Sequence, residues 1–595
     1  MLLRRKENAE AERVQRRDTT RYRPAGTLLA AAVLLLAGGA VEAGERLLTV
    51  VCTADLHGRL EPKTTSWSGD RLVGGAAVFT SYLEVLREEN RDGLLLFDVG
   101  DMWQGTLVSD LAEGKPLVKV FNALGCDAAA LGNHEFDFGP IGPANTPTTA
   151  LDDTLGALKQ RAKEAEYPML VANAFERETG NPIAAPTIRQ YTLLERQGTR
   201  IGVIGVTTEN TPETTHPANV QDIEFRNPAV SAREALKTLR AKGAKVIVVL
   251  AHMGARWNLR QGHYEGEIVE LAEAIGPAAL GDDGADLICG GHTHDRLDAV
   301  VGGVPLMQAY SHGVAFARAD LPIGEKGRVL RSEVVIHAPT ILENQDPLAP
   351  PGSSRKPRFL GREIAADSEM ETLIETVTIP ARKMAEHQVG VAAGKIVRVG
   401  RPGSPLGNLV TDAMRAYVPE VDLAVTNAGS IRTDLDAGPI TYGKLYRMLP
   451  FNNQLVTLTL TGEQIRQMFE KSVAGRRGIL EFSGAMVTVD PSAPVGRRIK
   501  EIRGPGGKRF LPEQRYHVAL HDFLLAGGDG YEVFGKGLDP KRLSVDLKEV
   551  LIRYLQGYGR AVEPDMTRRY HLSTTKAERP EDRPRPAGPV PPDLY

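Results

Sequence analysis

The chain has 595 residues, of which 42% are hydrophobic and 25% charged, and its formal net charge is −3 at pH 7. This length allows two or more domains with apolar cores, and the near-neutral charge argues against an extended basic surface that binds nucleic acid or anionic membranes. The three cysteines, Cys52, Cys126 and Cys289, are too few and too scattered for a disulfide framework. Each lies in or beside an apolar run, so we expect buried core thiols.

Residues 1–43 have the pattern of an export signal. Several arginines precede the apolar stretch PAGTLLAAAVLLLAGGAVEA, which ends in Val41-Glu42-Ala43, the small-x-small spacing that signal peptidases cleave. We therefore expect a mature protein that begins near Gly44 and is periplasmic or extracellular. An uncleaved membrane anchor is the alternative, because the apolar stretch is close to the length that spans a bilayer.

Seven apolar runs in residues 44–340 are typical of buried parallel strands, and helical patterns such as 77–90 and 232–244 alternate with them. The runs are RLLTVVCTADLHG, DGLLLFDVGD, DAAALGNHE, RIGVIGVTTEN, AKVIVVLAHMG, ADLICGGHTH and VPLMQAY. This alternation predicts a layered α/β architecture in which a sheet is covered on both sides.

The second half of the chain has a different composition. Residues 341–388 begin with a Pro-rich polar stretch and continue in a helical pattern, which indicates a linker and hinge helix. A second domain is expected over 389–572. Residues 573–595 are Pro-rich and charged, and we expect them to be disordered.

Polar residues end nearly every strand of the first region. They are Asp55, His57, Asp101, Asn133, His252, His292 and His294. The carboxyl ends of parallel strands form one rim where ligands bind, so we expect these residues to converge. Asp, His and Asn donors suit Mn²⁺, Zn²⁺ or similar ions, and seven donors exceed what one ion needs. A pair of ions bridged by one carboxylate would use them all and would clamp a phosphate group.

Each of these motifs is a weak signal alone, since a single His at a strand end is usually a core or surface residue. Their joint order is specific: D-x-H, G-D, G-N-H-E, H and G-H-x-H. With it, residues 47–320 resemble the calcineurin-like metallophosphoesterases. Residues 47–572 as a whole resemble the bacterial periplasmic and animal ecto-5′-nucleotidases, through GNHEFDFG, GVTTENTP, LGNLVTDAMR, NAGSIRTDL, LPFNNQLV and AGGDGYEVF.

The resemblance implies an α/β fold, with a four-layer α/β/β/α metallophosphoesterase domain and a C-terminal α/β 5′-nucleotidase substrate-binding domain. It implies two divalent metal ions (Mn, Zn, Co or similar) and hydrolysis of nucleoside 5′-phosphates, with a nucleotide rather than a nucleic-acid polymer as the partner. One ion would be held by Asp55, His57, Asp101 and His294. The other would be held by Asp101, Asn133, His252 and His292, which makes Asp101 the bridging ligand.

The resemblance also assigns residues that act on the substrate. His134 and Asp137 match a catalytic dyad in which Asp137 orients the imidazole, and His134 stabilises the developing charge or protonates the leaving oxygen. Another metal ligand or a buried hydrogen-bonding residue is the alternative for His134. Asp98 is expected to support the site without binding metal, whereas His216, His263 and His312 match no ligand position.

The second region would recognise the nucleotide. Phe451 and Phe523 would sandwich the base, and Asp529 would accept the ribose hydroxyls. Asn427, Arg432 and Arg401 would lie near the phosphate, and Arg398 is a further candidate there. Two departures affect this recognition: Ala428 replaces the first glycine of the family's Gly-Gly motif, and RPGSPLGN lacks the Glu-Ser-Asn that commonly precedes LGN.

Other activities remain open at this point. Cyclic 2′,3′-nucleotide phosphodiesterase and UDP-sugar hydrolase activity would use the same metal centre, and a related dimanganese thiosulfohydrolase shares the two-domain plan. The base clamp and Asp137 argue against the thiosulfohydrolase. An inactive surface-binding relative would show degraded ligands, whereas every expected metal position is filled. The sequence leaves the oligomeric state open.

Overall fold

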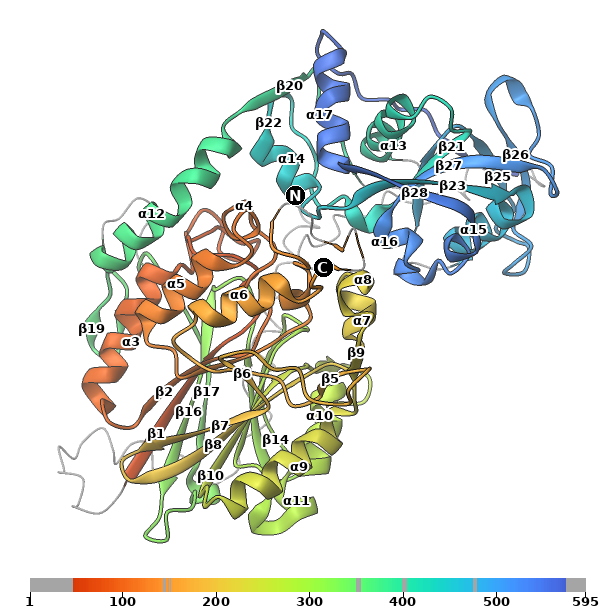
Figure 1. Cartoon of the computed structure of the whole chain (residues 1–595). Helices are drawn as coiled ribbons and strands as arrows, with labels where there is room; N and C mark the ends of the chain where they lie inside the picture. Colours follow the sequence, from red (N-terminus) through yellow and green to blue (C-terminus); the bar gives the residue numbers. More distant parts are fainter. Residues whose placement is uncertain are drawn as a thin grey trace. The chain divides into compact units, whose positions relative to one another are not determined.

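The computed structural model describes residues 46–142, 146–147, 149, 151–348, 355–398, 404–474 and 479–573 (Figure 1). The expected signal segment, residues 1–43, and residues 574–595 of the expected tail lie outside this set. Within the described residues, no helix is long and apolar enough to cross a membrane.

Two β-sheets organise the first half of the chain (Figure 1). The first contains, in spatial order, β17 (Val335–Ile341), β16 (Ala315–Ile323), β1 (Arg46–Thr53), β2 (Leu94–Asp98), β3 (Ala128–Ala130), β4 (Met169–Leu170) and β6 (Ile188–Arg189). The second contains β14 (Arg296–Val301), β15 (Val304–Ala309), β13 (Leu287–Gly290), β10 (Val246–His252), β8 (Thr199–Thr207) and β7 (Tyr191–Arg196). All seven apolar runs contain a strand, and the central strands of both sheets are parallel.

Four layers result, since each sheet has helices on one face and the other sheet on its second face. The first sheet packs on α3 (Ala76–Asn90), α5 (Lys115–Leu124) and α6 (Gly156–Glu164). The second packs on α9 (Pro228–Ala241) and α10 (Glu267–Ile275). The four-layer fold implied by the resemblance is therefore confirmed.

The apolar runs predicted a sheet covered on both sides, and both sheets are covered in this way, by helices on one face and by the other sheet on the second face. In β1, Val50 and Cys52 face the inter-sheet layer and Val51 faces the helices, so the strand is apolar throughout. A continuous apolar run shows that both faces are buried, but it does not distinguish a helix from a second sheet as the covering layer.

The second half contains a five-stranded sheet of β24 (Leu480–Ser483), β21 (Leu423–Asn427), β27 (Arg515–His521), β23 (Gln454–Thr461) and β28 (Leu538–Asp546). Helices α13 (Pro405–Tyr417) and α17 (Leu547–Gly557) pack on one face, and α15 (Gly462–Ala474) packs on the other. A smaller sheet contains β26 (Ile499–Arg503), β25 (Met486–Val489) and β29 (Tyr570–Leu572).

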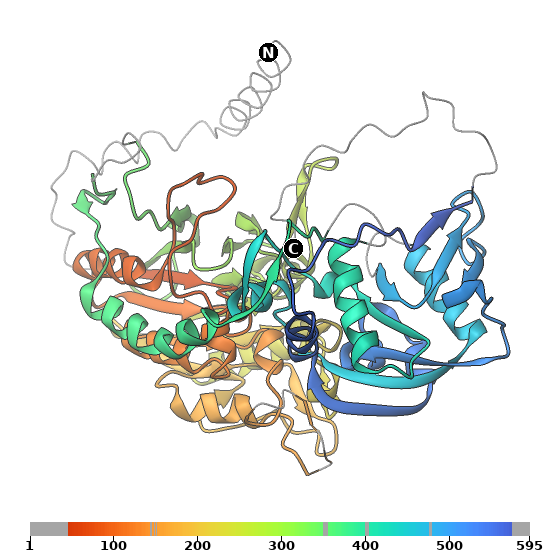
Figure 2. The same ribbon diagram turned by 90° about the horizontal axis from the view of Figure 1, so that it is seen from above.

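Helix α12 (Ser368–Ala385) lies between the two halves in the chain and packs on α3, α5, α4 (Leu107–Asp110) and α14 (Tyr442–Met448) (Figure 2). Asp367 caps it by accepting the N–H of Met370. After α12, β20 (Gln388–Ala392) pairs with β22 (Gly438–Thr441).

The remaining elements are short. They are the strand pairs β5 (Ala174–Glu176) with β9 (Ile223–Phe225), β11 (Arg256–Asn258) with β12 (His263–Glu265) and β18 (Arg358–Phe359) with β19 (Arg362–Glu363), and the helices α7 (Thr211–Thr214), α8 (Pro217–Val220), α11 (Pro277–Leu280) and α16 (Asp522–Leu525).

Candidate functional site

The polar residues expected at the strand ends do converge. They follow β1, β2, β3 and β13 or end β10, strands that belong to both sheets. The two sheets meet at this rim, where the N–H of His292 donates to both carboxylate oxygens of Asp55 at 2.8 and 3.0 Å. The described residues at the rim form three overlapping groups of side chains that could hold a metal ion.

One group contains Asp55, His57 and His294. The Nε2 atoms of His57 and His294 lie 2.9 Å apart, and Nε2 of His294 lies 3.6 Å from Oδ1 of Asp55. Nδ1 of His57 lies 3.0 Å from the carbonyl oxygen of Gln104, to which it can donate. That bond leaves the lone pair of Nε2 for a cation.

A second group contains Asp101, His252 and His292. Nε2 of His252 lies 3.1 Å from Oδ2 of Asp101 and 3.2 Å from Oδ1 of Asn133, and its Nδ1 can donate to the carbonyl of Val99 at 2.9 Å. Asp101 is also 4.0 Å from Nε2 of His57 in the first group. Its carboxylate therefore lies between the two groups, as a bridging ligand must.

The backbone at the rim adopts a conformation that non-glycine residues rarely take. Five of the seven expected ligands have φ between +48° and +71°: Asp55, His57, Asp101, His292 and His294. This left-handed backbone conformation costs free energy in a non-glycine residue, and residues that adopt it cluster at functional sites. Together with an oxygen and imidazole donor set, this strain fits a site built for divalent cations.

The protonation states of the expected ligands differ, because the carboxylate of Asp101 outweighs burial at His252 and raises its pKa to about 9, whereas burial prevails at the two histidines that follow β13. Burial lowers the pKa of His292 and of His294 to about 4, so both imidazoles are neutral and keep a lone pair at pH 7. Burial also raises the pKa of Asp55 to about 7, and the nearby Asp101 adds to the rise, although His252 opposes it. A bound cation would favour the ionised carboxylate.

His134 belongs to the third group, with His57 and Asp101, and it also forms a hydrogen-bonded pair with Asp137. Nδ1 of His134 lies 2.5 Å from Oδ2 of Asp137, whose Oδ1 accepts the hydroxyl of Thr215 at 2.7 Å. Burial opposes a charge on His134, but the carboxylates of Asp137 and Asp101 outweigh it and raise its pKa to about 10. The free atom Nε2 therefore carries a proton at neutral pH.

Glu135 is a site residue that the sequence analysis missed. Its buried carboxylate accepts the N–H groups of Gly132, Asp101 and Met102 at 2.7, 2.9 and 2.7 Å. These bonds fix the loop that carries Asp101. The motif Gly-Asn-His-Glu could have indicated this role, because the carboxylate of its last residue can accept the N–H of its glycine.

The other polar residues of the sequence analysis lie in different places. Asp98 accepts Thr53 Oγ1 and the Gly100 N–H, which supports the loop before Asp101. The ring of His312 lies 5.4 Å from that of His57, so this residue borders the first group. His263 is on β12 and is half exposed.

A cavity of about 310 Å³ adjoins the dyad. Its lining includes His134 and Asp137 together with Asn427, Arg432, Phe451, Phe523, Asp529 and His216. The Arg432 guanidinium lies 5.8 Å from the centre of the Phe451 ring, and Asn427 Nδ2 donates to Asp529 at 2.7 Å. Five of the six expected substrate residues therefore share one cavity with the dyad.

The two other arginine candidates, Arg401 and Arg398, have different outcomes. Arg401 lies outside the described residues. Arg398 donates to the carbonyl of Ile431 at 3.0 Å, and it is absent from the described lining of the cavity.

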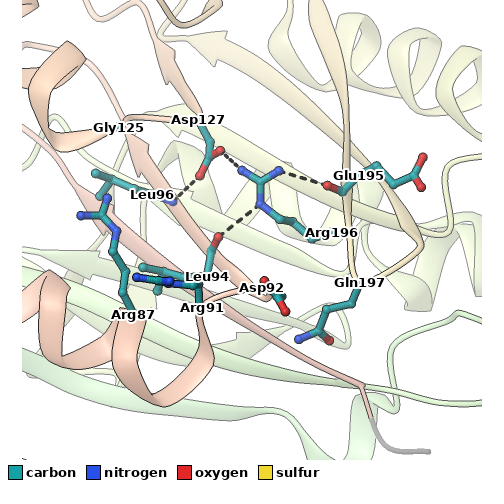
Figure 3. Close-up of a pocket in the computed structure, with 10 residues that line it drawn as sticks. All are labelled: Arg87, Arg91, Asp92, Leu94, Leu96, Gly125, Asp127, Glu195, Arg196 and Gln197. Carbon is teal, nitrogen blue, oxygen red and sulfur yellow. Dashed lines mark hydrogen bonds and ion pairs between the residues drawn. The ribbon is translucent and has the colours of Figure 1, made fainter.

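A different pocket lies at the amino end of β2, where Arg87, Arg91 and Arg196 line it (Figure 3). Arg196 pairs with Asp127, and Asp127 also accepts the N–H of Leu96 at 2.9 Å (Figure 3). These contacts join β7 of the second sheet to the first sheet. We therefore interpret this pocket as a structural link at the end of the strands opposite the metal-ligand rim.

The comparisons with known proteins agree with the fold. The calcineurin-like phosphoesterase family matches residues 48–296, and the 5′-nucleotidase C-terminal domain matches residues 382–536. Protein UshA of Yersinia enterocolitica is 28% identical over 517 residues, which are 81% of this chain and 86% of that protein. A snake venom 5′-nucleotidase of Crotalus adamanteus is 28% identical over 85% of both chains.

A solved structure of a 5′-nucleotidase precursor is also similar to this chain. The crystal structure of a 5′-nucleotidase precursor from Thermus thermophilus has a TM-score of 0.66 and 26% sequence identity, and the match covers 89% of this chain and 99% of that one. The chain therefore combines a calcineurin-like phosphoesterase domain over residues 48–296 with a 5′-nucleotidase C-terminal domain over residues 382–536.

Proposed function

We propose that this protein is an exported, metal-dependent phosphohydrolase that releases phosphate from nucleoside 5′-phosphates. The observation that carries the proposal is the cavity in which Phe451, Phe523 and Arg432 share one space with His134 and Asp137. Aromatic rings stack on a nucleobase, and a guanidinium pairs with a phosphate. The names of the 5′-nucleotidase relatives support this choice of substrate.

Two divalent ions would complete the site. Asp55, His57, Asp101 and His294 would hold one, and Asp101, Asn133, His252 and His292 would hold the other. These ions would polarise the phosphate and lower the pKa of an attacking water molecule.

The side chains of the chain itself supply the remaining chemistry. Asp137 keeps the ring of His134 oriented, with Thr215 holding Asp137 in turn. His134 then offers the proton on Nε2 to the phosphate oxygen that gains charge or to the leaving oxygen. Phe451 and Phe523 bind the base and Asp529 the ribose, which orients the phosphate toward His134.

The proposed organisation follows the expected boundaries. Residues 44–340 would form the catalytic domain, 341–388 the linker and hinge helix, and 389–572 the substrate-binding domain. A protein that starts at Gly44 after cleavage of residues 1–43 would be periplasmic or extracellular, and the N-terminal sequence of the exported protein tests this point.

The function is tested by phosphate release from AMP with the protein that starts at Gly44. The protein is first treated with a chelator and then receives Mn²⁺, Zn²⁺ or Co²⁺. We expect release only with metal, and we expect the Phe451→Ala/Phe523→Ala double variant to lose activity mainly through a raised KM. An aryl phosphate, which has no base to stack, is the control substrate.

Two results would contradict parts of this proposal. If the protein cleaves the aryl phosphate but not AMP, the metal centre stands and the nucleotide assignment is wrong. Metal-independent release of phosphate from AMP would contradict the metal assignment.

A further inference from the structure

Two of the three cysteines meet between the sheets. Cys52 on β1 and Cys289 on β13 are separated by 237 residues in the chain, yet their Sγ atoms lie 2.8 Å apart. Both side chains are almost completely buried, with 2% and 0% of their surface exposed. Buried thiols were predicted at these positions from the sequence, but their contact was not.

The strand alternation explains why the two side chains face each other. On β1, Cys52 points with Leu48 and Val50 into the inter-sheet layer, and on β13, Cys289 points with Leu287 into the same layer. Successive side chains of a strand alternate between faces, so both orientations are fixed by the sheets. The sheets are also held together three residues further on, where the His292 N–H donates to Asp55.

We propose that Cys52 and Cys289 form a disulfide in the mature protein, which ties β1 to β13 directly beneath the metal-ligand groups. The observed separation exceeds a covalent S–S bond by only about 0.8 Å. Disulfides that join two sheets packed face to face are an established arrangement.

The chemistry needs an oxidant. Each thiol loses its proton, an S–S bond forms, and the two electrons pass to a disulfide, which is reduced to two thiols. A thiol–disulfide oxidoreductase or oxidised glutathione can supply that disulfide. Because both sulfurs are buried, the bond forms during folding, before the sheets close. This step draws on the proposed export, since disulfides persist in oxidising compartments.

The tether would act on the metal centre through its strands. Asp55 and His57 follow β1, and His292 and His294 follow β13, so the bond fixes the separation of two pairs of expected ligands. It also closes a loop of more than two hundred residues in the unfolded chain, which favours the folded state.

Cys126 provides an internal reference. Its Sγ lies 3.3 Å from the carbonyl oxygen of Ala128, to which the thiol can donate, so we expect it to stay reduced. A chain with the tether thus has one free thiol, and a chain without it has three.

The test counts the thiols of the wild-type protein. Protein exported from cells, and protein refolded with oxidised glutathione, is unfolded without reductant, alkylated and weighed by mass spectrometry. We expect one alkylated cysteine, Cys126, and a peptide pair linked through Cys52 and Cys289 that separates on reduction. Three alkylated cysteines in both samples, or a linkage through Cys126, would overturn the proposal.

Thermal unfolding tests the stabilising role with matched variants. A reductant should lower the Tm of the wild type and of Cys126→Ser but leave that of Cys52→Ser unchanged. Equal responses in all three proteins would contradict a stabilising tether. Neither measurement depends on turnover, so a failure of the proposed hydrolysis is distinguishable from a failure of the disulfide.

Discussion

His134 and Glu135 are neighbours in the chain but act on different parts of the site. His134 points its Nδ1 at Asp137, and under the proposed function its Nε2 would face the substrate. Glu135 points its carboxylate at the backbone N–H groups of Gly132, Asp101 and Met102. The two residues therefore predict different consequences of substitution, one in catalysis and one in stability.

Replacing His134 should lower the rate of hydrolysis without lowering the metal content of the protein. We expect His134→Asn to lower kcat for AMP on the order of 10²-fold to 10⁴-fold with little change in KM, because a general acid contributes that much. Kinetics and metal content measured by mass spectrometry check this. His263→Asn, at a half-exposed histidine, is the control. Loss of metal that parallels the loss of kcat would show instead that His134 is a ligand.

Replacing Glu135 should destabilise the fold. In Glu135→Gln, the side-chain NH₂ group would face backbone N–H donors, which leaves buried donors unpaired at a cost of about 1–3 kcal/mol in the free energy of unfolding. Urea unfolding measures this value. Glu84→Gln, at a surface pair with Arg87, should change it by less than about 0.5 kcal/mol. Equal effects of the two substitutions would contradict the supporting role of Glu135.

Three helices meet beside the cavity: α4, α12 and α14. Leu107, Ala381 and Tyr446 form a small apolar cluster there, and the Tyr446 hydroxyl donates to the buried carboxylate of Asp110. Burial raises the pKa of Asp110 from 3.8 to about 7, although the hydrogen bonds from Tyr446 and Gly105 oppose the rise. The contact between these helices should therefore depend on pH.

The folded protein binds the Asp110 proton more tightly than the unfolded chain does. The stabilising contribution is therefore complete below pH 3.8 and is lost as the pH rises through about 7. We expect the Tm to fall as the pH rises from about 4 to about 7, and Asp110→Asn to remove part of that fall. Calorimetry of both proteins across this range checks it. Parallel Tm profiles would show that Asp110 does not titrate here.

At the scale of elements, each of the seven apolar runs was correctly predicted to contain a strand. Continuous burial leaves a clear trace in the sequence, as in VIVVLAH of β10. The division of the strands between two sheets cannot be predicted from the apolar pattern, because a helix and a second sheet bury a strand face equally well. The resemblance, rather than the pattern, supplied that division.

At the scale of the whole molecule, the rim could be predicted because parallel strands bring their carboxyl ends together, and Asp55 and His292 do meet there. The contact between Cys52 and Cys289 could not be predicted from the sequence. Alternation along a strand says which side chains face the same layer, but partners 237 residues apart are chosen by sheet packing. The role of Glu135 was hidden for a similar reason, since it depends on backbone groups of a folded loop.

The central claim is that two ions held at this rim are needed for hydrolysis. The most direct test adds Mn²⁺ in known amounts to chelator-treated protein while phosphate release from AMP is recorded. The account predicts activity that saturates at two equivalents per chain, and no activity in Asp101→Asn, which lacks the bridging carboxylate. Activity that saturates at one equivalent, or full activity without metal, would contradict it.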